Sequence, residues 1–216
     1  ISDQFAFRPT GSTTFALITL FHIIIHMLSK DKFVKVACLD FSKAFDGVNH
    51  SQLLSKYSLL NIPDFVYNWL VEFFYDRKHC TSFRGTTSET LQISSSVIQG
   101  SALGPASYAV TASDLIPLND GNYLLKFADD TYLITSGKNT NTTIDELNNV
   151  ENWANRNNLK LNRTKSKEIL FCSSKNKNKL PNVPRLPGIE RVTSLICLGV
   201  TVISHFSFTE HIDNII

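Results

Sequence analysis

Three aspartates follow or separate apolar runs, and this placement suits them for metal chemistry. Asp40 ends the apolar run 34–39, and the pair Asp129–Asp130 stands between the apolar runs 123–127 and 131–135. Carboxylates at the tips of buried strands are costly unless positive charge neutralises them. Two divalent cations held by such carboxylates can carry out phosphoryl transfer. The sequence therefore predicts a metal site that joins the three aspartates.

Each aspartate also has an ordinary structural interpretation. Asp is common in turns, where its side chain bonds to nearby backbone, and it often caps a helix. Taken singly, neither Asp40 nor the pair Asp129–Asp130 would carry a functional hypothesis. Their order along the chain, with the glycine-containing loop 99–105 between them, is more specific.

Length and composition allow one large domain or two small ones. The chain has 216 residues, of which 43% are apolar, and a net charge of only +2, so it is not a uniformly basic nucleic-acid binder. Its longest apolar stretch, 15–28, is too short to cross a bilayer, and we expect no membrane association. Because the chain begins at Ile1, we expect its natural start to lie upstream.

The basic residues are unevenly distributed. Between Arg156 and Arg191 there are ten Lys or Arg and two acids, Glu168 and Glu190. This stretch could follow a phosphate backbone, or it could be a solvated face with a Lys/Asn loop at 173–179. The four cysteines lack metal-ligand spacing, which favours buried free thiols in a reducing compartment.

Hydrophobic spacing predicts an α+β fold of helices and strands without regular alternation. The expected helices are 15–28, 51–60, 63–75, one from the loop 99–105 to residue 115, and one opened by a capping box at 143–146. The expected strands are 33–39, 81–83 and 91–97 around Gly85, 123–127 and 131–135 around the aspartate pair, 168–172, and 195–203.

Six short motifs occur in a fixed order. They are residues 3–9 with Ser12 and Thr13, residues 39–46, 99–105, 127–130, 159–162 with Lys165, and 197–200. Together they resemble the motifs of the reverse transcriptases of non-LTR (LINE-type) retrotransposons. The resemblance implies the palm of a right-hand polymerase, an antiparallel sheet backed by helices. It also implies an RNA-directed DNA polymerase that joins dNTPs to a DNA primer on an RNA template.

The resemblance assigns roles to individual residues. Asp40, Asp129 and Asp130 would bind two Mg²⁺ ions, or Mn²⁺ in their place, and the main-chain carbonyl of Phe41 would add a ligand. Phe45 would crowd a ribose 2′-hydroxyl and so favour deoxynucleotides, although a core aromatic is the ordinary interpretation of such a residue.

The remaining candidates surround the nucleotide. Gln99 and Gly100 would line the nucleotide and template, with Gly100 allowing close backbone approach. Lys165 would protonate or neutralise the pyrophosphate, unless it is simply a surface lysine. Arg8 would touch the triphosphate. Leu198-Gly199 would form the hairpin known as the primer grip.

The chain also departs from the family pattern. Ile98 stands where relatives usually carry Pro before the Gln of the second motif. We expect residues 1–32 to be partial fingers and residues 33–216 to be palm, with a fingers or helical insertion at about 47–97. We also expect the early fingers, the thumb and any endonuclease domain to be absent. The expected location is intracellular, in the nucleus, the cytoplasm or both.

Three other functions remain open. A viral RNA-dependent RNA polymerase generally has Gly before the aspartate pair and Asp five residues after the first carboxylate, so Ala128 and Phe45 argue against it. A catalytically silent remnant would keep the fold and bind nucleic acid through the stretch 156–191. A purely structural α+β domain would make the aspartate pair an ordinary turn, which the ordered motifs disfavour.

Overall fold

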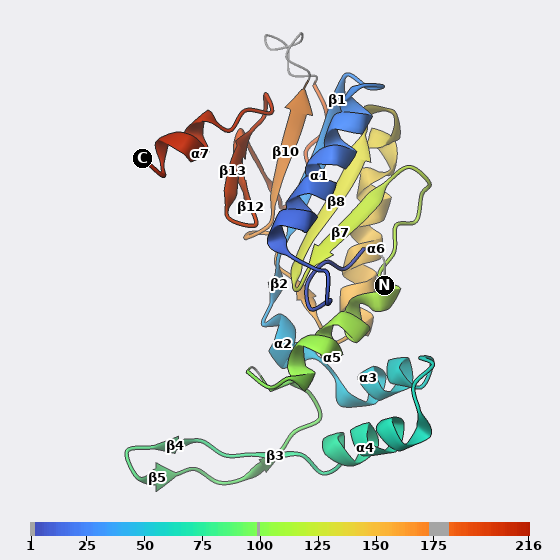
Figure 1. Cartoon of the computed structure of the whole chain (residues 1–216), viewed down its shortest axis with the longest axis vertical. Coiled ribbons are helices and arrows are strands. Elements are labelled where there is room, and N and C mark those ends of the chain that lie inside the picture. The colour runs from blue at the N-terminus through green and yellow to red at the C-terminus, as the bar shows by residue number, and fades with distance from the viewer. Residues whose placement is uncertain (1–2, 99, 173–181) are drawn as a thin grey trace.

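A mixed α/β arrangement is seen in the computed structural model, which describes residues 3–98, 100–172 and 182–216. Its centre is a five-stranded sheet in the order β11-β10-β1-β8-β7 (Figure 1). These strands are β1 (Phe33–Leu39), β7 (Tyr123–Phe127), β8 (Asp130–Ser136), β10 (Lys167–Cys172) and β11 (Glu190–Val192). Neighbours are antiparallel except β10 and β11, which are parallel. The expected antiparallel sheet backed by helices is confirmed, with one parallel pair at its edge.

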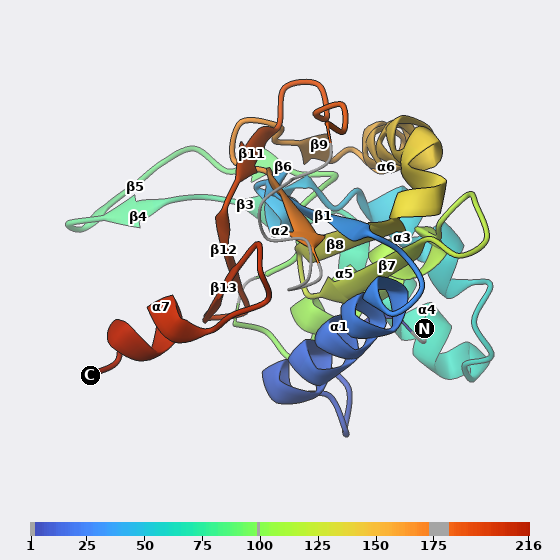
Figure 2. The same cartoon turned by 90° about the horizontal axis from the view of Figure 1, so that it is seen from above.

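Helices cover both faces of this sheet. Helix α1 (Thr13–Leu28) lies on one face and α6 (Thr143–Arg156) on the other (Figure 2). Alternate residues of a strand point to opposite faces, so Val36 of β1 packs in the core beneath α1, and Leu39 packs in the core beneath α6. Burial on both faces explains why β1 is an almost continuous apolar run in the sequence.

Helix α1 begins two residues earlier than expected. Its N-cap is Ser12, whose Oγ accepts the Phe15 N–H at 3.0 Å. Leu20 and Ile24 are fully buried against the sheet, as the helical spacing predicts. Ile25 is also apolar and lies next to Ile24 in the sequence, but its side chain is exposed. Across the described residues, no helix is both long and apolar enough to span a membrane.

The capping box expected at 143–146 is wrong, although the helix itself is confirmed. Thr143 is the first helical residue of α6, and its hydroxyl donates to the Thr140 carbonyl. Glu146 turns away from the helix start and accepts the N–H groups of Leu118 and Asn119, both at 2.9 Å. The Glu146 carboxylate therefore binds the loop before β7, whereas in a capping box it would accept an N–H at the start of its own helix.

A helical section lies beyond the end of the sheet at which β1 ends and β7 turns into β8 (Figure 1). It contains α2 (Ala44–Gly47), α3 (His50–Tyr57), α4 (Asp64–Phe74), α5 (Leu103–Thr111) and the 3-10 helix η1 (Ala112–Asp114). Helix α3 ends three residues before the expected residue 60, whereas α4 lies within the expected range. The remaining helices are η2 (Gly137–Thr142), before α6, and α7 (Thr209–Asp213).

Short two-stranded antiparallel sheets complete the fold. The pairs are β2 (Phe41–Ser42) with β9 (Lys160–Leu161), β3 (Lys78–His79) with β6 (Leu91–Gln92), β4 (Ser82–Phe83) with β5 (Thr86–Thr87), and β12 (Ser194–Cys197) with β13 (Val200–Ile203). The expected pairing of 81–83 with 91–97 is wrong. Residues after β6 bond to the α2–α3 region instead, where the N–H of Ser96 donates to the Val48 carbonyl at 2.9 Å.

The cysteines are free thiols, as expected, but they are not all buried. Cys172 and Cys197 are buried, Cys38 is half-buried and Cys80 is exposed. The burial of Cys80 was therefore predicted wrongly, because it lies in the exposed hairpin region between α4 and α5.

Candidate active site

Asp40 lies at the point where the chain leaves the central sheet. It follows β1, and its N–H donates to the Oγ of Ser166 at 3.1 Å. Its carbonyl accepts the N–H of Asn162 at 2.8 Å. The turn from Asn162 to Ser166 therefore holds the main chain of Asp40 from both sides, which limits movement of its carboxylate.

Asp129 and Asp130 form part of the tight turn between β7 and β8. Phe127 pairs with Asp130, so Ala128 and Asp129 are the two loop residues. Ala128 has φ 55°, which is unfavourable for a residue with a Cβ and is usual for the glycine of such turns. Both aspartates are exposed. The turn thus presents two carboxylates to solvent from a rigid hairpin.

The sheet register brings Asp40 next to this turn. Leu39 pairs with Thr131 across β1 and β8, and continuing that register places Asp40 opposite Asp130. Although part of its side chain is exposed, surrounding protein atoms partly desolvate the Asp130 carboxylate and so raise its pKa, and the negative charges of Asp129 and Asp40 raise it further. Residues separated by about 90 positions in sequence are thus close enough to repel one another electrostatically. A bound cation would relieve this repulsion.

The chemistry of these side chains fits a hard divalent ion. Carboxylate oxygens are the ligands that Mg²⁺ prefers. No lysine or arginine of the described residues forms an ion pair with any of the three carboxylates. In the same part of the chain, no three His, Cys, Asp or Glu side chains already surround a common point as metal ligands. The three aspartates are therefore electrostatic neighbours that do not surround a common point in this conformation.

Gln4 holds the aspartate turn, and sequence reasoning gave it no role. Its Oε1 accepts the Ala128 N–H at 3.0 Å, and its Nε2 donates to the Ala128 carbonyl at 3.3 Å. The same Oε1 accepts the Ala6 N–H at 3.0 Å. Only 1% of Gln4 is exposed. This buried amide therefore fixes the strained peptide next to Asp129, and the only signal for it was its place in the first motif.

The segment that carries Gln4 adds to the edge of the sheet. Lys126 of β7 accepts the Phe5 N–H and donates its own N–H to the Asp3 carbonyl, both at 2.8 Å. The Lys126 ammonium is fully buried, where it contacts the Asp3 carboxylate at 2.8 Å and donates to the carbonyls of Ala112 and Leu115. Burial lowers the pKa of this lysine, and Asp3 opposes that shift.

The Phe45 ring lies flat against a second aromatic ring. Its ring stacks on Tyr108 of α5, with centroids 4.8 Å apart and an interplanar angle of 21°. Burial raises the pKa of Tyr108, and the charges of Asp129 and Asp130 raise it further. Tyr108 is thus close enough to the aspartate turn to be affected by its charge, and its ring packs against that of Phe45. Sequence reasoning missed Tyr108.

The loop of the second motif is shaped by glycine and serine. Gln99 lies outside the described residues. Gly100 has φ 84° and open space above its Cα, which suits close approach of a ligand. Ser101 Oγ donates to the Ile98 carbonyl at 2.8 Å and accepts the Gly104 N–H at 3.0 Å. A Cβ at Gly104 would come within 2.6 Å of the Ile98 carbonyl oxygen, so the turn requires glycine there.

The other candidate residues are placed less directly. Phe41 lies in β2, next to Asp40, and its buried ring packs edge-on against Trp153 at 5.8 Å. Lys165 is exposed on the turn that holds Asp40, and its N–H donates to Asn162 Oδ1. Arg8 is exposed, and its guanidinium donates to the Gln4 carbonyl at 3.3 Å.

Three basic residues of the stretch 156–191 form ion pairs within the protein. Arg163 pairs with Glu151 at 2.6 Å, Arg191 with Glu168 at 2.8 Å, and Lys167 with Glu190. The lysines at 175, 177 and 179 lie outside the described residues. The hypothesis that this stretch follows a phosphate backbone stays a prediction, with fewer unpaired charges to support it.

The hairpin of the last motif is attached to the central sheet. Leu198 and Gly199 link β12 to β13 and both have positive φ, as a two-residue type I′ turn requires. The Leu198 N–H donates to the hydroxyl of Tyr132 at 3.2 Å. Tyr132 is buried in β8, two residues after Asp130, so it couples the hairpin to the strand that carries the aspartates.

The central sheet carries one aspartate at the end of a strand and two in the adjacent turn. This arrangement is typical of the fold class called the polymerase palm. Comparison with solved structures confirms this class. An apo telomerase from Candida tropicalis, truncated from its C-terminal domain, aligns with a TM-score of 0.65 and 14% identity, covering 96% of this chain and 40% of that chain. The telomerase of the same organism with a fragment of telomeric RNA gives 0.62 and 15%, covering 92% of this chain and 33% of that chain.

The sequence identifies the family within this class. The model of the reverse transcriptase (RNA-dependent DNA polymerase) family matches residues 1–202, and the chain belongs to that family. Membership of the family implies dependence on a divalent metal ion. The resemblance to reverse transcriptases of non-LTR retrotransposons is likewise confirmed.

Two relatives from Drosophila melanogaster illustrate that resemblance. The chain is 28% identical over 230 residues to the RNA-directed DNA polymerase from mobile element jockey, and 24% identical over 220 residues to a probable RNA-directed DNA polymerase from transposon X-element. Each match covers 98% of this chain and 24% of the relative. The chain thus spans about a quarter of the length of these curated relatives.

Proposed function

We propose that this chain carries the polymerase centre of an RNA-directed DNA polymerase from a non-LTR retrotransposon. It would extend a DNA primer on an RNA template with dNTPs. The observation that supports this most is the meeting of Asp40 with Asp129 and Asp130 at one end of the sheet. Family membership and the relatives named as RNA-directed DNA polymerases supply the reaction.

Asp40, Asp129, Asp130 and the main-chain carbonyl of Phe41 would hold two Mg²⁺ ions, for which Mn²⁺ could substitute. Bound ions of this kind activate the attacking hydroxyl and neutralise charge on the leaving group. The protein contributes rigidity: the turn at Asn162–Ser166 fixes Asp40, and Gln4 fixes the peptide before Asp129. Ligands held in advance need little reorganisation during the reaction.

The remaining residues would bind and select the nucleotide. Phe45 would crowd a 2′-hydroxyl, while Gln99 and Gly100 would line the nucleotide and template. Arg8 would contact the triphosphate, and Lys165 would neutralise or protonate the pyrophosphate. We place the enzyme inside the cell, in the nucleus, the cytoplasm or both, because its template and target are nucleic acids.

Primer extension on an RNA template tests this function. The assay uses a protein that carries this chain within its natural open reading frame. Asp129→Asn should lower the extension rate by roughly three orders of magnitude, since an amide cannot replace an anionic metal ligand. The matched control is Asp120→Asn, which changes another exposed aspartate in the loop at the opposite end of β7.

Two outcomes would contradict the proposal. Equal extension by Asp129→Asn and the unmodified protein would remove the metal role of Asp129. Tight binding of primer and template without any extension by the unmodified protein would identify a catalytically silent nucleic-acid-binding remnant.

A further inference from the structure

The hairpin of β12 and β13 is attached to the central sheet at two points. It forms a separate two-stranded sheet beside β10 (Figure 1). After β13, the Ser204 carbonyl accepts the Cys172 N–H of β10 at 3.0 Å. Cys172 pairs with Phe33, the first residue of β1, so this attachment lies at the end of the sheet opposite Asp40.

The turn of this hairpin is attached through a single tyrosine. The Leu198 N–H donates to the Tyr132 hydroxyl at 3.2 Å. In the part of the chain that the structure describes, no other hydrogen bond joins residues 194–203 to the central sheet. The hairpin otherwise packs through apolar side chains, since Leu195 and Val202 share a hydrophobic cluster with Tyr132. Loss of the hydroxyl would therefore free the turn and leave the rest of the hairpin in place.

Tyr132 can hold the turn because its own position is fixed. It is the third residue of β8, pairs with Cys38 on one side and Leu125 on the other, and is only 1% exposed. Burial raises the pKa of Tyr132, so the hydroxyl stays neutral and keeps both its proton and its lone pairs. The oxygen can thus accept the Leu198 N–H while the side chain also hydrogen-bonds with the Cys38 thiol.

The turn lies on the face of the sheet toward which Asp130 projects. Side chains two residues apart in a strand point to the same face, so Asp130 and Tyr132 share the side of the hairpin. Burial raises the pKa of the Cys197 thiol, just before the turn, and Cys38 and Asp130 raise it further electrostatically. Gly199, within the turn, has φ 86°, and a Cβ there would meet no atom within 4 Å. An open turn therefore stands within electrostatic reach of a proposed metal ligand.

We propose that the Tyr132 hydroxyl positions the end of the primer, because it sets the height of the turn at Leu198 and Gly199 above the sheet. The inference rests on the proposed function and on the resemblance that makes this turn the primer grip. Tyr132 is buried and acts through the turn, so it is a positioning residue. A misplacement of about 1 Å can slow a reaction by about a hundredfold, so a single hydrogen bond here is enough to matter.

Single-nucleotide addition to a matched DNA primer on an RNA template tests this role. The assay uses the protein that carries this chain within its natural open reading frame. Tyr132→Phe should lower kcat by about tenfold, because the ring still fills its place but the Leu198 N–H loses its acceptor and the turn can shift. The KM for dNTP should change by less than about twofold, because the nucleotide would be bound by other elements.

Hydrogen exchange measures the attachment of the turn without catalysis. In Tyr132→Phe, the amides of residues 197–200 should exchange about tenfold faster than in the unmodified protein. The amides of β8 and β10 should exchange at unchanged rates, because their ladder hydrogen bonds do not involve the hydroxyl. Faster exchange throughout the sheet would instead identify a general loss of stability.

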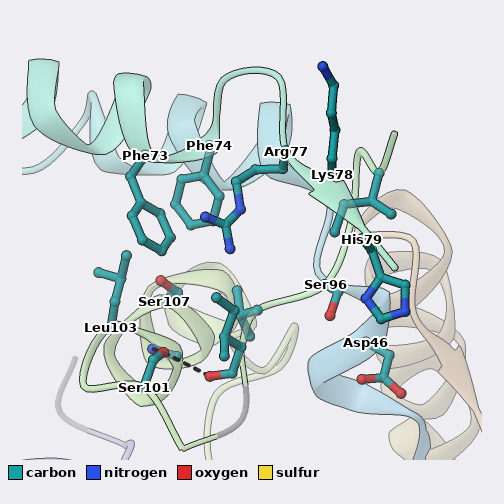
Figure 3. A pocket seen from close by; sticks show the side chains of 14 residues that line it. Asp46, Phe73, Phe74, Arg77, Lys78, His79, Ser96, Ser101, Leu103 and Ser107 are labelled. Atoms are coloured by element: carbon teal, nitrogen blue, oxygen red, sulfur yellow. Dashed lines mark hydrogen bonds between the residues drawn. The ribbon is translucent and has the colours of Figure 1, made fainter. Parts of the chain in front are cut away.

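Tyr57→Phe is the matched control, since it also removes a buried tyrosine hydroxyl. That hydroxyl lies 3.2 Å from Ser107 Oγ in the helical section. Ser107 lines a cavity of about 360 Å³ between α4 and α5, away from the hairpin (Figure 3). Tyr57→Phe should leave kcat, KM and the exchange of residues 197–200 as they are in the unmodified protein.

A lower kcat with a steady KM, together with faster exchange confined to the turn, would support the inference. An unchanged kcat in Tyr132→Phe, a raised KM in place of a lower kcat, or an equal loss in Tyr57→Phe would overturn it. Each of these results requires an active unmodified protein, so it leaves the proposed function intact. An unmodified protein that adds no nucleotide would contradict the proposed function itself, and this inference with it.

Discussion

At the scale of single residues, the position of the Phe45 ring is fixed by its contact with Tyr108 more than by its own burial. Its ring is half-buried and lies flat on Tyr108, which is itself almost fully buried. A stacked ring of this kind has few alternative positions, because a shift would break the contact on a close-packed neighbour. The geometry is thus suited to a rigid steric boundary.

Phe45→Ala should raise the incorporation of ribonucleotides relative to deoxynucleotides. The expected change is on the order of tenfold, which is typical of discrimination based on the size of one substituent. It is measured as the ratio of kcat/KM for rNTP and dNTP in primer extension. Phe33→Ala is the control, because Phe33 is also half-buried but starts β1 at the opposite end of the sheet. An unchanged ratio would make Phe45 a packing residue only.

The candidate site was predictable where its residues follow local rules. Asp40 and Asp129–Asp130 stand next to apolar strands, so their position at strand ends could be derived from the sequence alone. The support by Tyr108 could not, because it joins residues 63 positions apart through a helix whose register is set by tertiary packing. The hydrogen bonds between Gln4 and Ala128 join residues 124 positions apart, and they likewise correspond to no local pattern in the sequence.

At the scale of elements, the short segment before α1 positions the turn between β7 and β8. Asp3 and Phe5 bond to the backbone of Lys126, and Gln4 bonds to the peptide of Ala128 in both directions. Buried peptide groups that lose such partners cost about 1–3 kcal/mol each. The segment therefore stabilises a turn in which the positive φ of Ala128 is unfavourable.

Gln4→Leu should raise the Mg²⁺ concentration needed for half-maximal primer extension by roughly tenfold. The reason is that Leu fills the space but leaves the Ala128 peptide without partners, so the carboxylates of Asp129 and Asp130 are held less firmly. Asn157→Leu is the control, because Asn157 is another buried amide, bonded to the Trp153 carbonyl at 2.8 Å away from the aspartates. A lower melting temperature with an unchanged Mg²⁺ requirement would show that Gln4 is purely structural.

Elements were predicted well where one periodicity dominates a segment. Strands β1, β7 and β8 lie within one residue of expectation because both of their faces are buried. The region between α4 and α5 was predicted poorly, since its hairpin residues 80–92 are exposed and carry no hydrophobic pattern. In such segments the pairing depends on turn geometry, here at Arg84-Gly85, where both residues have positive φ.

At the scale of the whole molecule, Glu146 joins the layer of α6 to the sheet. Its carboxylate accepts hydrogen bonds from the main-chain N–H groups of Leu118 and Asn119 and from the side-chain amides of Asn119 and Asn122. Burial alone would raise the pKa of Glu146, but these hydrogen bonds together hold it below its ordinary value of 4.5. The loop that leads into β7 is therefore anchored to α6 through an anion.

This lowered pKa predicts how stability depends on pH. A carboxyl whose pKa is lower in the folded state stabilises the fold above its ordinary value, and that contribution is lost as the pH falls through 4.5 toward the folded pKa. Glu146→Gln should lower the free energy of unfolding at neutral pH by about 1–3 kcal/mol, because an amide cannot accept all four hydrogen bonds. Its unfolding should also depend less on pH between about 3 and 5 than that of the unmodified protein.

Urea unfolding at several pH values measures both effects, and Glu72→Gln, at an exposed position of α4, is the control. Equal pH dependence in the Glu146→Gln variant and the unmodified protein would show that acid stability is set elsewhere, with the buried Glu168, which pairs with Arg191, as the next carboxylate to test.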